Sequence, residues 1–325
     1  MNRSYIIGID GGASKTDFVL CNLDGIVINR FFAASCNPND IGMECCIDVL
    51  IQGIAKLTFG LEKAKIHLYA GISGGATGNN PEIINQYLSR YFKNYKIYNG
   101  SDAVNAMQLG LHEEDGIALI AGTGSIVYSR RKQLYKRIGG WGYLFDNGGS
   151  GYHLGRDAIN AALCEFDGTG GKTILTSLIE EKLGMPVAEA LAEIYTKGKR
   201  YIASFAPLVF DGFRQQDPIA QEIIRRNATF LTRQIHTGAM DFPENNILVS
   251  CIGGLFRQRD ILLPIMQEEL GKKYQLYIPE LEPVFGAVRE ACRLAGIRII
   301  PEFESNFKDS VDRLMEASND KDGNA

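Results

Sequence analysis

The feature that most constrains this chain is the stretch from residue 5 to residue 18, where an apolar run leads into a glycine-rich turn. The run that starts at Tyr5 is typical of a buried strand, and it ends at Asp10 and two glycines. Phe18-Val-Leu20 then begins a second strand rather than a helix. The stretch therefore predicts a β-hairpin with an acidic residue and glycines near its tip.

The spacing of these glycines separates the hairpin from two common phosphate-binding loops. It fits neither the Gly-x-Gly-x-x-Gly of dinucleotide sites nor the Gly-x-x-x-x-Gly-Lys-Ser/Thr of P-loops. Glycines let backbone amides approach an anion, Ser14 and Thr16 add hydroxyls, and the carboxylate of Asp10 can hold a hydrated cation. Two interpretations remain at this point: a site for phosphate with a divalent metal, or an ordinary hairpin turn that uses glycine for positive φ.

Length and composition indicate the broad class of protein. A chain of 325 residues is longer than one hydrophobic core usually organises, which predicts two domains. Hydrophobic residues make up 45% and charged residues 22%, as in globular enzymes. The formal net charge of -4 provides no basic surplus, so we expect no nucleic-acid partner.

The cysteines and the N-terminus bear on the compartment. Seven cysteines without a Cys-x-x-Cys pair indicate reduced thiols and argue against a zinc or iron–sulfur site. The first strand follows the N-terminus directly, and no apolar run is long enough to span a bilayer. We expect a cytoplasmic protein without a signal peptide or membrane partner.

Hydrophobic periodicity predicts an α/β order in the first part of the chain. After the hairpin we expect a third strand, then alternating helices and strands, which gives a β-β-β-α-β-α-β-α unit. The predicted elements are a strand at 26–33, a helix at 41–57, a strand at 66–72, a helix at 81–91, a short strand at 96–98 and a helix at 103–111.

The same pattern then starts again about 110 residues later. Residues 116–125 form a strand that enters a Gly-Thr-Gly-Ser turn, and Ile126 begins another strand. The repeat predicts a duplicated architecture with two phosphate-binding turns that face each other across a cleft. We expect one lobe at 1–113 and a second at 114–325, with a helical insert at about 152–236, a strand at 248–251 and helices after Gly254 and from Pro283.

Taken together, the motifs resemble those of the actin-like ATPase superfamily of sugar kinases, Hsp70 and actin. Asp10-Gly-Gly-Ala-Ser-Lys-Thr16, Gly122-Thr-Gly-Ser125 and Cys251-Ile-Gly-Gly-Leu-Phe256 resemble its two phosphate motifs and its adenosine motif. Asn37, Asp102 and Gly139-Gly-Trp-Gly142 resemble the N-acetylglucosamine kinase branch, which is grouped with the BadF/BadG/BcrA/BcrD ATPases. The resemblance extends from residue 6 to about residue 290, with the motifs in the family's order.

The resemblance implies a two-lobed ribonuclease H-like fold, Mg-ATP as the phosphoryl donor, an amino sugar as the acceptor and a homodimer. Asp102 would be the catalytic base and Asp10 would lie near Mg²⁺. The nucleotide would contact Gly11, Gly12, Ala13, Ser14, Lys15, Thr16, Gly122, Thr123, Gly124, Ser125, Gly253 and Gly254. The sugar would contact Asn37, Ser73, Gly74, Asp102, Gly140, Trp141, Gly142 and Asn147.

Several of these residues also have a simpler interpretation. Asp102 follows Ser101 at a strand-to-helix junction and could be a helix N-cap. Trp141 could be a core residue, and Asn37 before Pro38 could be a turn residue.

One position departs from the family pattern. Where the branch has Gly-Asp-Glu-Gly-Ser, this chain has Asp146-Asn-Gly-Gly-Ser150, so that Asn147 stands where the family has Asp. An amide donates as well as accepts, whereas a carboxylate only accepts, which leaves the choice of sugar open.

A second segment looks like the end of a Walker A loop. Gly168-Thr-Gly-Gly-Lys-Thr173 lacks the first glycine of that loop, because position 166 is Phe166, and no buried strand precedes it. We therefore predict a turn that caps the next helix.

The leading hypothesis is an ATP-dependent kinase that phosphorylates the 6-hydroxyl of N-acetylglucosamine or a related amino sugar. One alternative is a glucosamine or other hexose kinase. Another is the ATPase that activates 2-hydroxyacyl-CoA dehydratase systems, which requires cluster-ligating cysteines that Cys45-Cys46 supply poorly. A third is a sugar-responsive regulator, for which the chain offers no DNA-binding segment before its first strand.

Overall fold

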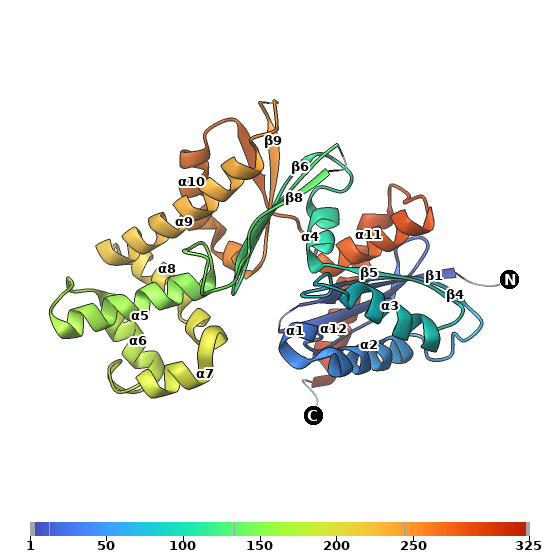
Figure 1. Ribbon diagram of the computed structural model, residues 1–325, viewed down its shortest axis with the longest axis horizontal. Coiled ribbons are helices and arrows are strands. Elements are labelled where there is room, and N and C mark those ends of the chain that lie inside the picture. The colour runs from blue at the N-terminus through green and yellow to red at the C-terminus, as the bar shows by residue number, and fades with distance from the viewer. Residues whose placement is uncertain (1–3, 13, 133, 244, 323–325) are drawn as a thin grey trace. The chain divides into compact units, whose positions relative to one another are not determined.

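The computed structural model describes residues 4–12, 14–132, 134–243 and 245–322 (Figure 1). The chain divides into two units by its internal contacts. Unit 1 comprises residues 1–113 and 280–325, and unit 2 comprises residues 114–279.

Unit 1 is built on a mixed five-stranded sheet in the order β3-β2-β1-β4-β5. β1, β2 and β3 are antiparallel neighbours, whereas β4 and β5 continue the sheet in parallel. Its elements are β1 (Ser4–Gly11), β2 (Lys15–Asn22), β3 (Val27–Ala34), α1 (Pro38–Ile41), α2 (Met43–Leu57), β4 (Lys65–Ile72), α3 (Asn80–Tyr91), β5 (Tyr95–Gly100), α4 (Asp102–Gly110), α11 (Pro283–Ala295) and α12 (Phe303–Asp322). The predicted hairpin at the start of the chain is confirmed.

The alternation of side chains along β1 assigns the two faces of this sheet. Ile7 and Ile9 belong to the buried cluster that includes residues of α2 and α3. Gly8 lies on the other face, where an added Cβ would stand 2.6 Å from Val288 Cγ2 of α11. Asp10 shares the face of Gly8, which places its carboxylate on the side of α4 and α11.

Unit 2 repeats this strand order around its own core. Its sheet runs β10-β9-β6-β7-β8, with β6, β7 and β8 antiparallel and β9 and β10 parallel to β6. Its elements are β6 (Gly116–Ala121), β7 (Ser125–Arg131), β8 (Leu134–Gly139), α5 (Gly151–Asp167), α6 (Ile174–Leu183), α7 (Leu191–Ala203), α8 (Ala206–Arg214), α9 (Pro218–Gly238), β9 (Ile247–Ile252), the 3-10 helix η1 (Gly254–Gln258), α10 (Arg259–Leu270) and β10 (Tyr274–Tyr277). The repeated strand order confirms the predicted duplication.

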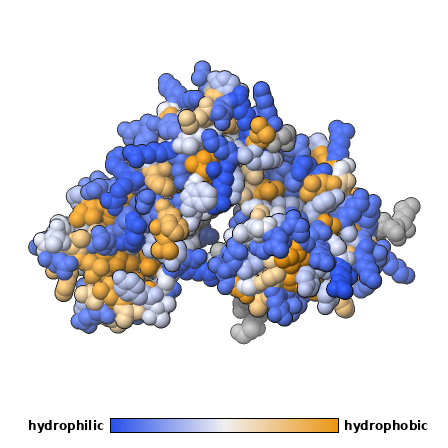
Figure 2. All heavy atoms as spheres, viewed as in Figure 1, coloured by the Kyte–Doolittle hydropathy of each residue, from blue (hydrophilic) through white to orange (hydrophobic). Residues whose placement is uncertain are grey.

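The five helices α5 to α9 stand between the third and fourth strands of unit 2, where unit 1 has α1 and α2. They form the predicted helical insert. On the face drawn in Figure 2, apolar side chains gather over α5, α6 and α7. Phe166, Met185 and Tyr195 are among the exposed apolar residues of this region.

The C-terminal segment differs from the expected division of the chain. The sequence assigned residues 280–325 to the second lobe, whereas in the structure they belong to unit 1. The apolar face of α11 packs against β1, β4 and α4, and Ser310 of α12 accepts a hydrogen bond from the backbone of Val27. Periodicity predicts that a helix buries one face, but it does not say against which sheet.

None of the helices in the described ranges is both long enough and apolar enough to span a membrane.

Candidate active site

The carboxylate of Asp10 lies at the end of β1, on the face that α4 covers. Asn105 Nδ2 donates to Asp10 Oδ1 at 2.7 Å. The Asp10 side chain is half-buried, and its desolvation raises its pKa to about 7 against the opposing effect of the Asn105 bond. The negative charges of Asp102 and Asp17 raise it further, whereas Lys15 lowers it. Within the described part of the chain, no ion pair involves this carboxylate.

Asp102 is the first residue of α4, and it is not the cap of that helix. Ser101 is the N-cap, because its hydroxyl accepts from the backbone of Ala103 at 3.2 Å. The same hydroxyl donates to Asp102 Oδ1 at 3.1 Å. Burial raises the pKa of Asp102, while hydrogen bonds from Ser101 and Ser73 oppose the rise. The alternative of Asp102 as a simple cap is therefore wrong.

Asn37, Ser73 and Gly74 meet beside the hairpin of unit 1. Asn37 caps the short α1, accepting from Asn39 N at 3.0 Å, and its Nδ2 donates to Asp40 at 2.9 Å. A Cβ on Gly74 would stand 2.4 Å from Asn37 Oδ1, so only glycine fits there. The amide of Ser73 donates to Gly11 O at 2.7 Å. Three residues predicted to bind sugar therefore adjoin those predicted to bind phosphate.

The tip of the first hairpin is closed by a bond from Gly12 N to Lys15 O at 3.0 Å. Gly11 has no room for a side chain, because a Cβ would lie 2.5 Å from Cys36 Sγ. Ser14 and Lys15 are exposed. Ala13, which the sequence also assigned to this site, lies outside the described residues.

Thr16 differs from its expected role. Its side chain is fully buried, and its hydroxyl donates to Ala34 O at 2.7 Å. Because Thr16 pairs with Gly11 in the β1–β2 ladder, its side chain lies on the face of Gly11, opposite to that of Asp10. Only the backbone of Thr16 is available for a ligand.

In unit 2, the second glycine-rich turn rests on the start of α5. Gly151 N donates to Gly122 O at 2.7 Å, and Tyr152 N donates to Thr123 O at 3.2 Å. A Cβ added to Gly122 or Gly124 would meet no atom within 4 Å. The backbone at the start of α5 thus holds the turn in place, while the space beside Gly122 and Gly124 is open. Ser125 is buried, and its hydroxyl donates to Gly148 O at 3.3 Å.

The predicted adenosine motif lies against this turn. Gly253 has φ of 111°, and a Cβ there would stand 2.5 Å from Ala121 O at the end of β6. Gly254 starts η1 with open space beside it. Unit 2 therefore brings Gly253 and Gly254 together with Gly122.

The loop that contains Trp141 is held in place at Asp146. Asp146 is buried, and its carboxylate accepts from Gly142 N at 3.1 Å. His153, which pairs with the Ser150 hydroxyl at 2.7 Å, also binds the carbonyl of Asp146 at 2.7 Å.

Trp141 itself is 65% exposed, and the Arg137 guanidinium lies 4.5 Å from its ring centroid. The alternative of Trp141 as a core residue is therefore wrong. Gly140 packs closely on Ile126, since a Cβ would lie 2.4 Å from its Cδ1. Asn147 is exposed. At the position where the chain departs from the family pattern, the buried carboxylate thus belongs to Asp146.

The segment from Gly168 to Thr173, which looks like the end of a Walker A loop, connects the end of α5 to the start of α6, as predicted. Gly168 is the left-handed C-cap of α5, and Thr173 is the N-cap of α6, with its hydroxyl accepting from Leu175 N.

Sequence reasoning missed Asn105, which joins Asp10 to α4, and Asn227, whose Oδ1 accepts from Gly149 N at 2.8 Å. A weak signal existed for Asn105. It lies three residues after Asp102, and residues at that spacing share a helix face.

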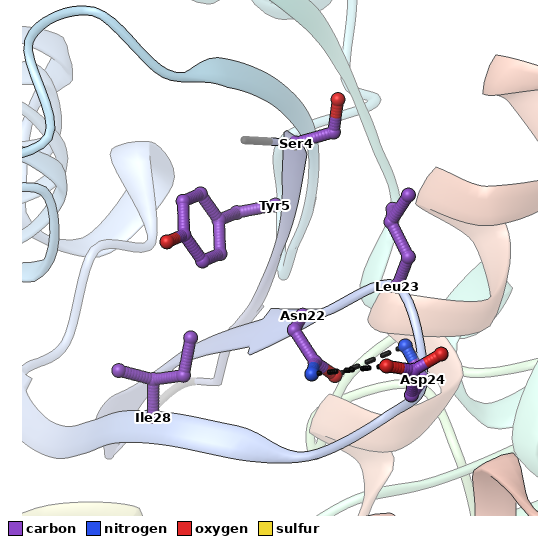
Figure 3. A pocket seen from close by; sticks show the side chains of 6 residues that line it. All are labelled: Ser4, Tyr5, Asn22, Leu23, Asp24 and Ile28. Atoms are coloured by element: carbon purple, nitrogen blue, oxygen red, sulfur yellow. Dashed lines mark hydrogen bonds between the residues drawn. The ribbon is translucent and has the colours of Figure 1, made fainter. Parts of the chain in front are cut away.

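A depression of about 400 Å³ lies at the other end of β1, away from Asp10 (Figure 3). It contains none of the predicted site residues. Its lining is Ser4, Tyr5, Asn22, Leu23, Asp24 and Ile28.

The donors around Asp10 fit a metal that arrives with a nucleotide. The described residues contain no cluster of three or more His, Cys, Asp or Glu that could enclose an ion. Mg²⁺ is often held by one or two carboxylates together with waters and substrate phosphates. A single half-buried carboxylate beside an amide-lined turn matches that arrangement.

The paired 3-2-1-4-5 sheets, each with a glycine turn between its first two strands, define the fold of the actin-like ATPases. A structural-genomics protein from Chromobacterium violaceum, assigned as an N-acetylglucosamine kinase, superposes with a TM-score of 0.69 over 89% of this chain and 99% of its own. At 22% identity this likeness shows the fold alone.

The sequence profile of the BadF/BadG/BcrA/BcrD ATPase family matches residues 7–291, and the chain belongs to this family. The N-acetylmuramic acid/N-acetylglucosamine kinase of Clostridium acetobutylicum is 31% identical over 87% of this chain and 97% of its own length. The N-acetyl-D-glucosamine kinase of Dictyostelium discoideum is 28% identical over 84% and 92%.

Proposed function

We propose that the protein is an ATP-dependent kinase that transfers the γ-phosphoryl group of Mg-ATP to the 6-hydroxyl of N-acetylglucosamine or a related amino sugar. The observation that carries the proposal is the placement of Asp102. Ser101, not Asp102, is the N-cap of α4, and the negative charge of Asp102 raises the pKa of Asp10. The names of the two kinases above point to the same class of substrate.

Asp102 would act as the base. It accepts the proton of the attacking sugar hydroxyl while the new O–P bond forms and the bond from the γ-phosphorus to the leaving oxygen breaks. A raised pKa makes Asp102 a stronger base than an ordinary aspartate, and the Ser101 hydroxyl holds its Oδ1 in place.

The phosphates would be bound by backbone amides of the two glycine turns, at Gly11 to Thr16 and at Gly122 to Ser125. Amides fixed by the surrounding structure stabilise transferred charge without having to reorganise. Asp10 would hold the magnesium ion, which neutralises phosphate charge when it is bound. Gly253 and Gly254 would adjoin the adenosine.

The sugar would contact Asn37, Ser73, Gly74, Gly140, Trp141, Gly142 and Asn147. The Asn37 Nδ2 already donates to Asp40, and its Oδ1 already accepts from Asn39 N. A sugar hydroxyl would therefore donate to the remaining lone pair of Asn37 Oδ1. The exposed amide of Asn147 favours a different hydroxyl or 2-substituent from the family's carboxylate. This residue motivates glucosamine or another hexose as the alternative substrate.

The alternative of an ATPase activator has less support from the cysteines. Cys45 is exposed and Cys46 is buried, so these neighbours point in different directions and cannot both ligate one cluster. We also propose that the protein is cytoplasmic and that it forms a homodimer. Analytical ultracentrifugation would test the homodimer.

The decisive experiment is an assay of ADP release from Mg-ATP with N-acetylglucosamine, N-acetylmuramic acid, glucosamine, N-acetylmannosamine, glucose and no sugar. Turnover that depends on one amino sugar is the expected result. ATP hydrolysis that is indifferent to every sugar would refute the kinase and favour the activator. Phosphate position is read from the product by NMR, and a product other than the 6-phosphate would refute that part of the proposal.

A further inference from the structure

Asn105 has an unusual environment for a buried side chain of a helix. It is fully buried in α4, and its Nδ2 faces three acceptor oxygens. They are Asp10 Oδ1 at 2.7 Å, Gly71 O at 3.3 Å and Ile9 O at 3.4 Å. The shortest of the three bonds goes to the carboxylate.

The opposite end of the same amide is unsatisfied. Asn105 Oδ1 is buried and has no hydrogen-bond partner within the described part of the chain. A buried acceptor without a partner costs stability. The amide therefore gives up one hydrogen bond while it directs its nitrogen to the ends of β1 and β4.

Two glycines make room for this side chain and its helix. A Cβ on Gly71 of β4 would lie 2.1 Å from Asn105 Oδ1, and a Cβ on Gly286 of α11 would lie 1.8 Å from Asn105 O. Helix α4 can approach the sheet and α11 this closely only because both positions lack side chains. The close packing fixes the position from which Asn105 reaches Asp10.

The same helix carries Asp102 at its first position, three residues before Asn105. The next turn of α4 is tied to α11 by Gln108, whose Nε2 donates to the buried Glu290 at 2.9 Å. Helix α4 thus connects the candidate base and the candidate metal-binding carboxylate through one rigid element.

We propose that Asn105 is a positioning residue that orients the Asp10 carboxylate for the metal–nucleotide complex, an inference that rests on the proposed function. The amide leaves Asp10 Oδ2 without this constraint and directs Oδ1 toward α4. A residue that supports a metal-binding carboxylate commonly affects metal affinity about 10- to 100-fold when it is replaced.

The test measures ADP binding by calorimetry, once with Mg²⁺ and once with EDTA, so that the gain in affinity due to the metal is obtained without turnover. We expect Asn105→Ser to reduce this metal-dependent gain by about 10- to 100-fold and to leave ADP affinity in EDTA nearly unchanged. Gln108→Met is the matched control. It removes a buried hydrogen bond one turn farther along the same helix, between Gln108 and Glu290, while Arg293 continues to pair with Glu290.

A metal-dependent gain in Asn105→Ser equal to that of the wild type would overturn the proposal. An equal loss in Gln108→Met would also overturn it, because any loosening of α4 would then suffice. A wild type that binds ADP without any effect of Mg²⁺ would overturn both this inference and the proposed function. The inference alone fails when the wild type responds to Mg²⁺ and the variant responds equally. Should Asn105→Ser not fold, Asn105→Thr fills more of the space and is judged by the same criteria.

Discussion

Replacement of Asp10 by asparagine should stabilise the ligand-free protein at high pH. In the folded protein burial raises the pKa of Asp10 from 3.8 to about 7, whereas in the unfolded chain it is near its usual value. The folded state therefore holds a proton between these two pKa values that the unfolded state releases. The free energy of unfolding must then fall as pH rises from about 4 to about 7.

The size of the effect follows from the two pKa values. Their difference corresponds to about 4 kcal/mol if it is fully expressed. Because Asp10 is only half-buried, solvent screens part of this, and we expect a gain of about 2 kcal/mol for Asp10→Asn at pH 8. The asparagine can turn its carbonyl oxygen to Asn105 Nδ2 and so retain that hydrogen bond. At pH 4 the wild-type carboxyl is already neutral, and the gain should vanish.

The assay is urea denaturation of both proteins in EDTA at several pH values between 4 and 8. Asp48→Asn, at an exposed carboxylate on α2 of the same unit, controls for the loss of a charge. Unfolding free energies of wild type and Asp10→Asn that run parallel from pH 4 to pH 8 would refute the reasoning. Asp10→Asn should at the same time lose the effect of Mg²⁺ on ADP binding.

Three further predictions concern other positions. Asp102→Asn should keep the fold and lower kcat by about 10²- to 10⁴-fold in the ADP-release assay, and near-normal turnover would remove it from the mechanism. Gly253→Ala should lose about 2 kcal/mol of stability in urea denaturation, because its φ is positive and its Cβ would clash with Ala121 O; an unchanged midpoint would contradict this. Ser150→Ala removes the α5 cap and the partner of His153, and it should cost about 2 kcal/mol. A loss below about 0.5 kcal/mol in the same assay would show that the cap is dispensable.

The fold was largely predictable because its strands carry local signals. A glycine turn between two apolar strands indicated each hairpin, and its repetition indicated the duplication. The partner of the last two helices was not predictable. The apolar face of α11 fits a sheet of either unit by periodicity, and its contact with unit 1 depends on Gly8 and Gly286, which admit the helix.

The site was predictable where a motif places a residue and less so where packing orients a side chain. Asp10 and Asp102 were predicted from their motifs, and in the structure the charge of Asp102 raises the pKa of Asp10. Thr16 was predicted in the same way, but the strand register puts its side chain on the face opposite to Asp10, where its hydroxyl donates to the carbonyl of Ala34. Asn105 was missed because its role arises from the approach of α4 to β1, which no local pattern encodes.

Two aspartates that are direct cross-strand neighbours show what distinguishes a binding carboxylate from a structural one. Asp10 and Asp17 pair across β1 and β2, and burial raises the pKa of both. Asp17 receives the Arg30 guanidinium through two hydrogen bonds, at 3.1 and 2.6 Å. Asp10 receives one bond from a neutral amide, and the charge of Lys15 has only a smaller effect on it.

A structural role for Asp10 would be served by a cation such as Arg30, since a buried carboxylate without one costs stability. The chain instead places beside Asp10 a neutral donor whose own oxygen is unsatisfied. The unpaired carboxylate of Asp10 and the unsatisfied oxygen of Asn105 each cost stability, and both lie at the same end of β1. Such a combination is expected at a site that binds a cation together with its ligand. The contrast with Asp17 therefore favours a ligand-binding role for Asp10 over an ordinary hairpin turn, on grounds independent of the family motif.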